Sequence, residues 1–472
     1  MALRRTEQVW MGLGLMLGCV VPVSMVGQQA AAWVVKPEWV QAHEEFLASD
    51  VMQGRGSATR DEEIAATYVA SEFMGYGLKM APGMTGYIQS AEVVAPELDG
   101  RGTLTAGGVE LKEGPALEVL VSTGESVSGP LLRVKAADVK KASSAKGAVI
   151  VVTDVPSGSS SMSVMRELRR SGAAAIVLPE DESMRGLFTM FGGKTRVSVR
   201  LKEDAAQRGG MTLLVVDHEG MAKLAEVKDG ERVALTLHAV PQAKDRETYN
   251  AIGYLEGTDP SSGTILLTAH LDHLGVGKPV NGDGIYNGAN DDAAGTTAVL
   301  ELAHALAAGP RLKRNVLFVC YGSEEAGELG STYFGEHPPV PLKSLVANLE
   351  FEMIGSQDPK MPKGVLLLTG WERSNLGPTL KAHGALLGPD PYPEQHFFER
   401  SDNYALALQG VVAHTAAGWG TVPTYHQPDD DVAHLDVPFM TAAIQSLVQP
   451  MEWLADSDFK PKWVAGGRPT RP

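Results

Sequence analysis

The sequence predicts an α/β protein: a three-layer α/β/α arrangement around a mostly parallel sheet, interrupted by an inserted β-rich segment. Two observations support this fold class. Between residues 246 and 458, apolar strand-like runs alternate with helical patterns, and such alternation favours a parallel sheet with helices on both faces. Between about 91 and 245, glycine, serine and short β-rich runs prevail instead.

Composition limits the class of protein. The chain has 472 residues, too many for one ordinary domain, with 44% hydrophobic and 21% charged residues, as in globular proteins. There are 41 basic and 57 acidic residues, which gives a formal net charge of −16. This excess of negative charge argues against nucleic acid or an anionic membrane surface as a partner.

The first 32 residues have the pattern of an export signal. MALRR supplies positive charge, residues 10–26 are apolar, and Ala30 to Ala32 offer a small-residue cleavage site. We therefore expect a signal peptide over 1–32 and an exported, periplasmic or extracellular chain whose mature part has no integral membrane span. Lipidation at Cys19 is a weaker alternative. Cys320 is then the one thiol of the mature chain, and its apolar surroundings predict a core residue.

Residues 33–90 begin the main domain. Thr59 and Glu62 have the spacing of a capping box and predict that a helix begins there and runs through 61–77. Its end is predicted at Gly75 and Gly77. The residues expected on its apolar face are Ala65, Tyr68, Val69 and Phe73.

The inserted segment, residues 91–245, contains several predicted elements but no gathering of metal-binding or nucleophilic side chains. We expect strands over 147–155 and 212–217, and a short helix over 219–227. Residues 164–181 have the pattern of a helix, a glycine turn and a strand.

Residues 246–458 carry the alternating pattern. Predicted strands are 263–270, 315–320 and part of 345–355. The helix predicted over 295–309 has one apolar face, formed by Val299, Leu302, Ala303 and Leu306. We expect the tail, residues 459–472, to be loosely ordered.

Polar residues follow the predicted strands, where ligands collect in sheets of this kind. They are His270, Asp272, Asp291, Asp292, Glu324, Glu325 and Glu352, with His426 in a later loop. Each motif by itself has an ordinary explanation as a turn, a helix cap or a solvated strand end. Their joint occurrence at four strand ends favours a functional site.

The residue types suit two zinc-like ions, because imidazole nitrogen and carboxylate oxygen are zinc ligands and one carboxylate can bridge two metals. In this interpretation Asp291 is the bridge. His270 and Glu352 complete one metal, and Glu325 and His426 complete the other. Asp272 would hold the outer nitrogen of His270. Glu324 is left without a metal and is predicted to move protons.

These residues lie in segments that resemble peptidase family M28, zinc aminopeptidases and carboxypeptidases. The segments are TAHLDHLG (268–275), GANDDAAG (288–295), SEEAGELGS (323–331), FEMIG (351–355), ERSDNYALALQGV (399–411) and TYHQPDDD (424–431). The resemblance implies the zinc exopeptidase fold and two Zn²⁺ ions held by the five ligands above. It implies Glu324 as general base and acid, Asp272 as the orienter of His270, and Tyr425 near the oxyanion.

The resemblance also implies a substrate side formed by Arg400, Ser401 and Asp402. The inserted segment, with KGAVIVV and SGAAAIVL, is similar to a protease-associated (PA) domain. The chain departs from the family at Glu352, where Asp is usual, and at Asn403 and Glu328. These departures bear on affinity and substrate preference more than on the reaction.

We therefore expect a secreted exopeptidase acting on peptide substrates. Glu352 and Glu328 would favour a substrate's free ammonium and hence an aminopeptidase, whereas Arg400 would favour a carboxylate and a carboxypeptidase. The sequence leaves two rival functions open. One is a single-zinc glutaminyl cyclase, in which a tryptophan is typical where this chain has Tyr425, and the second is a non-catalytic receptor-like protein.

Overall fold

The computed structural model describes residues 33–470, except 95, 143–144, 155–163, 166–167, 169–170, 183, 185–194, 204–211 and 241–245. The expected signal peptide over 1–32 and the alternative lipidation site at Cys19 lie outside the described residues. Within the described part of the chain, none of the helices is both long and apolar enough to cross a membrane.

The first sheet carries the predicted alternating elements. The nine strands described in it run in the spatial order β10 (Arg200–Leu201), β1 (Ile88–Val94), β14 (Arg246–Leu255), β18 (Asn315–Tyr321), β15 (Thr264–His270), β19 (Leu345–Glu352), β22 (Ala413–Ala417), β20 (Leu366–Leu368) and β21 (Leu387–Pro389). The central strands β18, β15, β19 and β22 are parallel to one another. The pairs β1–β14, β14–β18 and β20–β22 are antiparallel, so the mostly parallel prediction holds for the centre of the sheet and not for its flanks.

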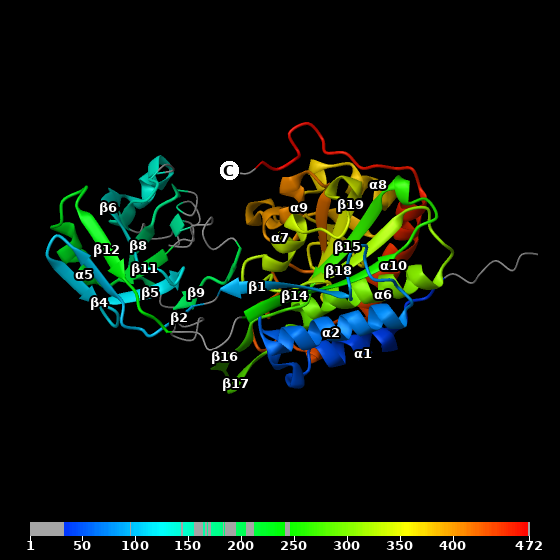
Figure 1. The fold of residues 1–472 in the computed structure, drawn as a ribbon, viewed down its shortest axis with the longest axis horizontal. Helices are drawn as coiled ribbons and strands as arrows, with labels where there is room; N and C mark the ends of the chain where they lie inside the picture. The colour runs from blue at the N-terminus through cyan, green and yellow to red at the C-terminus, as the bar shows by residue number, and fades with distance from the viewer. Residues whose placement is uncertain are drawn as a thin grey trace, which may run out of the picture. The chain divides into compact units, whose positions relative to one another are not determined.

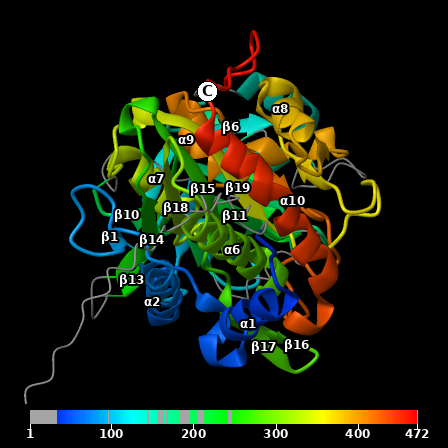
Figure 2. The same ribbon diagram turned by 90° about the vertical axis from the view of Figure 1, so that its right-hand side faces the viewer.

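Helices cover both faces of this sheet (Figures 1 and 2). On one face lie α1 (Pro37–Leu47), α2 (Arg60–Gly75), α6 (Ala294–Ala308) and α10 (Val437–Asp456), which pack on one another and on β14 and β15. On the other face α7 (Leu329–Glu336) and α9 (Asn403–Gln409) pack together. The predicted three-layer α/β/α fold is confirmed.

The helix α6 is buried on nearly every side. Between Ala294 and Leu306 only His304 is partly exposed, so burial extends well beyond the single apolar face that the sequence predicts. The reason is its place in the fold: α6 lies against the sheet and is itself covered by α1, α2 and α10. Cys320 on β18 is fully buried and forms no disulfide bond, as expected for a core thiol, and burial raises its pKa.

The second sheet occupies most of the inserted segment. Its described strands are, in spatial order, β4 (Val109–Lys112), β3 (Thr103–Ala106), β12 (Arg232–Thr236), β6 (Val127–Val134), β7 (Val149–Val152), β8 (Ala175–Pro179), β11 (Thr212–Val216), β5 (Leu117–Ser122) and β9 (Arg196–Val197). Alternate residues of one strand enter two separate hydrophobic cores: Val149 and Val151 lie in one, and Ile150 and Val152 in the other. Both faces of the sheet are therefore covered.

The predicted elements of this segment fall where expected, with shorter bounds. β7 and β11 are the strands predicted over 147–155 and 212–217, and α5 (His218–Ala225) is the short helix. Part of the helix expected within 164–181 lies outside the described residues, while its strand is β8. Arg200–Leu201 pairs with β1 of the first sheet. A short part of the segment 91–245 therefore belongs to the first sheet and not to the second.

The start of α2 confirms one half of the predicted capping box. The Thr59 hydroxyl accepts a hydrogen bond from the Asp61 N–H at 3.2 Å. Glu62 does not return to the Thr59 N–H, and its carboxylate accepts from the Ala58 N–H at 2.6 Å. The capping-box prediction is wrong in this half, because Glu62 is turned inward and is fully buried.

As far as the structure describes it, the tail is held by contacts with Arg373, Ser374 and Phe398, so the prediction of a loose tail is wrong up to residue 470. Trp463 pairs with Ser374, and the Val464 N–H donates to the Arg373 carbonyl at 2.9 Å. The Trp463 ring also packs edge-on against Phe398, and this aromatic contact helps to hold the tail in place.

We expect Phe73→Ala to lower the free energy of unfolding by about 3–5 kcal/mol, the usual loss for a buried aromatic residue. Phe73 on α2 is fully buried, against the Phe318 ring on the sheet and against Gly253, where a side chain would collide with it. The control is the neighbouring Met74→Ala, since Met74 is 60% exposed. Chemical denaturation measures both variants, and equal losses would contradict this packing.

Candidate metal centre

The carboxyl ends of three parallel strands bring the candidate residues together. His270 is the last residue of β15, Glu352 is the last residue of β19, and Glu324 and Glu325 follow the end of β18. Because β15 pairs in parallel with both neighbours, these ends meet at one edge of the sheet. Asp291 reaches the same edge from the turn before α6, and the peptide bond between Asp291 and Asp292 is cis.

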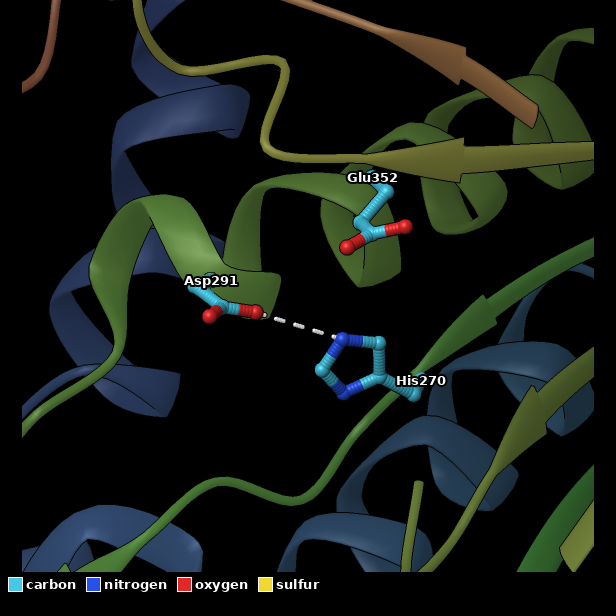
Figure 3. Close-up of side chains that lie close together, drawn as sticks. All are labelled: His270, Asp291 and Glu352. Atoms are coloured by element: carbon cyan, nitrogen blue, oxygen red, sulfur yellow. Dashed lines mark ion pairs between the residues drawn. The ribbon is translucent and has the colours of Figure 1, made fainter. Parts of the chain in front are cut away.

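Two groups of possible metal ligands share Asp291. In the first, ligand atoms of His270, Asp291 and Glu352 lie within 4.8 Å of one another. Figure 3 shows these three side chains converging from different elements, with His270 Nε2 at 3.3 Å from Asp291 Oδ1. In the second group, His273, Asp291 and Glu325 meet the same criterion. A carboxylate common to both groups is what the predicted bridging role of Asp291 requires.

His426 approaches the second group from a loop far away in the sequence. Its Nε2 lies 3.2 Å from Asp291 Oδ2 and 3.0 Å from Glu325 Oε1. The ring of Tyr425 stacks on the His426 ring, with a centroid separation of 3.8 Å. The five ligands expected from the sequence therefore all reach this edge of the sheet.

The charges of these groups depend on each other. Burial would raise the pKa of Asp291, but the neighbouring His270 and His426 hold it well below its ordinary value. Burial would lower the pKa of His426, but Glu325 and Asp291 raise it to about 10. Burial raises the pKa of Glu352 to about 7, and burial also raises that of Glu324. The imidazole and carboxylate groups therefore stabilise each other's charged forms at this centre.

Buried polar atoms without a hydrogen-bond partner test whether a metal fits here. Within the described residues, His270 Nε2, Glu325 Oε1 and both ring nitrogens of His273 are such atoms. Unsatisfied buried polar atoms are rare in folded proteins and call for an explanation, such as an ion. The donor set is imidazole nitrogen and carboxylate oxygen, which suits zinc. The residues fit a zinc site.

Asp272 supports the site differently from the prediction. The His270 Nδ1 atom lies 3.2 Å from the main-chain oxygen of Asp272, whereas the nearer carboxylate oxygen is 3.7 Å away. The Asp272 carboxylate instead accepts hydrogen bonds from Glu324 N–H at 2.9 Å and from the Ser57 hydroxyl at 2.6 Å. Asp272 therefore orients His270 mainly through its backbone, and its side chain holds the glutamate loop.

Asp292 also has a supporting place. Its Oδ1 atom accepts from the Gly295 and Met353 N–H groups, each at 2.9 Å. Since Met353 follows Glu352, this carboxylate ties the turn of Asp291 to the end of β19. The sequence predicts Asp291 as the bridge and assigns Asp292 no role, and the structure gives Asp292 this supporting place.

Arg55 is a supporting residue that the sequence analysis missed. It is fully buried, and its guanidinium donates to the Leu271 carbonyl at 2.8 Å and to the Gly288 carbonyl at 2.8 Å. It also donates to the carbonyls of Leu47 and Asn287 at 2.6 and 2.7 Å. One side chain thus joins the end of α1, the segment after His270 and the turn before Asp291. Burial lowers the pKa of Arg55, against the effect of Glu44 and Asp272.

Three buried carboxyl groups were also missed, and each accepts a main-chain N–H. Glu62 accepts from Tyr249 N–H at 2.8 Å and from the Ser323 hydroxyl at 2.9 Å. Asp430 accepts from Asn290 and Asp291 N–H at 2.9 and 3.0 Å. Glu350 accepts from Asn403 N–H at 2.7 Å. The one available signal was an acidic residue inside an apolar run, as in LEFE around Glu350.

The residues expected on the substrate side divide into two sets. Arg400 is exposed and lines a small pocket of about 40 Å³ with Glu352, Tyr425 and apolar residues that include Leu367 and Phe397. Asp402 is fully buried and does not line this pocket, so its direct contact with substrate is not supported. The Ser401 hydroxyl donates to Glu350 at 2.8 Å, which makes it a supporting residue.

The backbone around the site is strained. Ser323, Glu328, Met353 and His426 have φ of 53°, 58°, 52° and 56°, in the left-handed region that side chains disfavour. Each lies within three residues of a candidate ligand or is one. Conformations of this kind persist where the surrounding structure fixes them and are enriched at functional sites.

A model of the family described as Peptidase family M28 matches residues 250–449. Among curated proteins, an aminopeptidase of Pseudomonas aeruginosa is 31% identical over 151 residues, which cover 31% of this chain and 25% of that protein. The probable lipoprotein aminopeptidase LpqL of Mycobacterium tuberculosis is 26% identical over 296 residues, covering 50% of this chain and 55% of that protein. The matched region thus spans from a quarter to about half the length of these relatives.

Solved structures extend the similarity to the fold. A zinc aminopeptidase from Bacillus subtilis aligns with a TM-score of 0.54 and 18% identity, covering 90% of this chain and 96% of that chain. An aminopeptidase from Aneurinibacillus sp. strain AM-1 aligns with a TM-score of 0.54 and 19% identity, covering 89% and 94%. At these identities the likeness concerns the fold.

We expect Arg55→Lys to weaken metal retention and to lower the unfolding temperature, because a single ammonium has no planar fork for four carbonyl groups. Dialysis against a zinc buffer followed by metal analysis checks the first effect, and thermal denaturation the second. Arg60→Lys is the control, since the Arg60 side chain is 82% exposed. Unchanged metal retention in Arg55→Lys would contradict the supporting role.

Proposed function

We propose that this chain, an M28-family, aminopeptidase-like protein over residues 250–449, removes residues from the N-termini of peptides with the help of two zinc ions. The observation that carries the proposal is the shared Asp291. It belongs to two groups of ligand atoms at the end of the first sheet. A pair of cations bridged by one carboxylate is a common arrangement for hydrolysis.

The proposed ligand roles keep the first group and, in the second, take His426 in place of His273, because His426 is the ligand that the family resemblance implies. We assign His270, Asp291 and Glu352 to the first position, and Asp291, Glu325 and His426 to the second. Bound zinc ions would lower the pKa of a water molecule and polarise the carbonyl of the scissile bond. The remaining chemistry belongs to side chains that do not hold a metal.

Glu324 is the candidate for proton transfer. Burial, together with nearby Glu325, raises the pKa of its carboxyl group, which suits a group that accepts a proton from water and returns it to the leaving amine. Its main-chain N–H is held by Asp272, which fixes the loop next to the centre. Tyr425 lines the pocket beside Glu352, and its hydroxyl is our candidate donor to the developing oxyanion.

The acidic character of the pocket side supports an aminopeptidase. Burial, and then nearby Glu350 and Glu352, raise the pKa of Glu328 to about 8. A substrate ammonium placed there would relieve the repulsion among these carboxyl groups. Arg400 is the one feature that favours binding a free carboxylate instead, and hence a carboxypeptidase. Metal stoichiometry separates both from a single-zinc cyclase, and absence of turnover would favour a non-catalytic receptor.

We also propose the domain division suggested by the sequence: residues 33–90 and 246–458 form the peptidase, and 91–245 form an inserted PA-like module that shapes access to the site, apart from Ala91–Val94 and Arg200–Leu201, which pair in the first sheet. We further propose that residues 1–32 direct export. The division is supported by the separate hydrophobic cores of the second sheet.

We expect Glu324→Gln to keep near-normal zinc content and to lose kcat by orders of magnitude, because only proton transfer is removed. Glu325→Gln should lose one zinc, since it removes a ligand. Metal analysis and turnover of the same preparations measure both. Equal loss of zinc in the two variants would refute this division of roles.

We expect an N-acetylated peptide to resist cleavage and a peptide with a C-terminal amide to be cleaved, because the ammonium is the group to be recognised. Turnover of matched free, acetylated and amidated peptides tests the direction of attack. The reverse pattern would make the protein a carboxypeptidase and Arg400 the first residue to replace.

A further inference from the structure

The second metal position has a histidine that the five expected ligands do not include. His273 follows Asp272 by one residue, and its Nδ1 atom lies 2.9 Å from Glu325 Oε1 and 3.9 Å from Asp291 Oδ2. We propose that His273 is a fourth protein ligand of the second zinc, beside Asp291, Glu325 and His426. This inference rests on the proposed two-zinc function and deepens it.

Four of the six distances among these ligand atoms can be compared with a tetrahedral set. Zinc bonds to nitrogen and oxygen of about 2.0–2.1 Å place the corners of a tetrahedron about 3.3–3.4 Å apart. The contacts of His273 Nδ1 measure 2.9 and 3.9 Å, and those of His426 Nε2 with the same two carboxylates measure 3.0 and 3.2 Å. These are four of the six edges of a tetrahedron, and they scatter about the expected value, so each imidazole lies within reach of an ion that Asp291 and Glu325 would hold.

A hydrogen bond does not explain the position of His273. The side chain is fully buried, and both ring nitrogens lack a hydrogen-bond partner within the described part of the chain. The contact of 2.9 Å between His273 Nδ1 and Glu325 Oε1 is an ion-pair distance, and it leaves Nε2 without a partner among the described residues. An imidazole of this kind, enclosed and facing two carboxylates, is expected to hold an ion.

The surrounding chain fixes the ring in this place. The His273 N–H donates to the Arg55 carbonyl at 3.1 Å. Gly288 has φ of 62°, and a Cβ atom there would lie 2.5 Å from His273 Cγ and 2.3 Å from the Asp291 carbonyl oxygen. Glycine at 288 therefore lets the turn of Asp291 close against the imidazole. The His426 ring meets the His273 ring edge-on, with centroids 5.6 Å apart.

A fourth ligand makes the two positions chemically unequal. The first would have one imidazole, from His270, and two carboxylates, whereas the second would have two imidazoles and two carboxylates. Imidazole suits zinc, copper, nickel and iron, whereas carboxylate suits magnesium, calcium and manganese. The second position should therefore fill first with zinc, and the first should exchange its metal more readily.

X-ray absorption spectroscopy of the full chain loaded with one zinc tests the proposal directly, because it reports the number of imidazoles on the metal. We expect two imidazoles per zinc in the unchanged protein and one in His273→Asn. We also expect the tightest zinc dissociation constant of the variant to rise at least tenfold in a zinc-buffer titration. His43→Asn is the matched control, since His43 is also a buried histidine but lies outside both ligand groups, and it should change neither readout.

One imidazole per zinc in the unchanged protein, or an unaltered dissociation constant in a folded His273→Asn, would overturn the proposal. If the variant fails to fold, as judged by thermal denaturation, the spectrum of the unchanged protein still decides. The outcome is separate from that of the proposed function: a protein with two imidazoles on its first zinc that leaves every peptide intact would retain this site and lose the aminopeptidase assignment.

Discussion

At the carboxyl edge of the first sheet, buried carboxyl groups outnumber the cationic side chains near them, and the arrangement of the site follows from how each one is compensated. Burying a charge is costly unless it is paired or hydrogen-bonded. Asp272, Asp292 and Asp430 each accept a main-chain N–H from a segment that carries or adjoins a candidate ligand. Glu62 and Glu350 accept the N–H groups of Tyr249 and Asn403, and Glu62 also accepts from the Ser323 hydroxyl beside the glutamate pair. These carboxylates are satisfied by the chain itself, and in return they hold the loops in place.

The carboxylates that face the centre are compensated differently. Asp291 and Glu325 lie against imidazoles, and Glu325 Oε1 has no hydrogen-bond partner among the described residues. Burial would raise the pKa of Glu325, but His426 and His273 hold it at about 2. Asp292 is bound by main-chain N–H groups whereas Asp291 faces imidazoles, which is why we propose Asp291, and not Asp292, for both metal positions. A buried charge that the backbone does not satisfy is available to a cation.

The N-terminal segment, residues 33–90, also supplies hydrogen-bond partners for buried polar groups around the site. Arg55 lies more than two hundred residues before three of the four carbonyls that it binds, and Glu62 lies 187 and 261 residues before Tyr249 and Ser323. Both side chains are fully buried. The guanidinium of Arg55 supplies hydrogen-bond donors to carbonyls that the loops leave unpaired. Residues 33–90 are thus part of the site's framework, although the inserted segment separates them from the strands that carry the ligands.

The sequence by itself determined the fold class and the central strands, and it predicted five ligands that the structure brings to one edge of the sheet, because apolar periodicity and residue type at strand ends are local signals. It also predicted Thr59 as a helix cap, since capping depends on neighbours in the chain. Only the tertiary structure decided that Glu62 turns inward and that Asp272 orients His270 through its backbone. It also decided that residues 459–470 pack against Arg373, Ser374 and Phe398. It alone placed Arg55 and His273 at the centre. These outcomes depend on contacts between segments distant in sequence, and no periodicity or spacing records which buried group a side chain will meet.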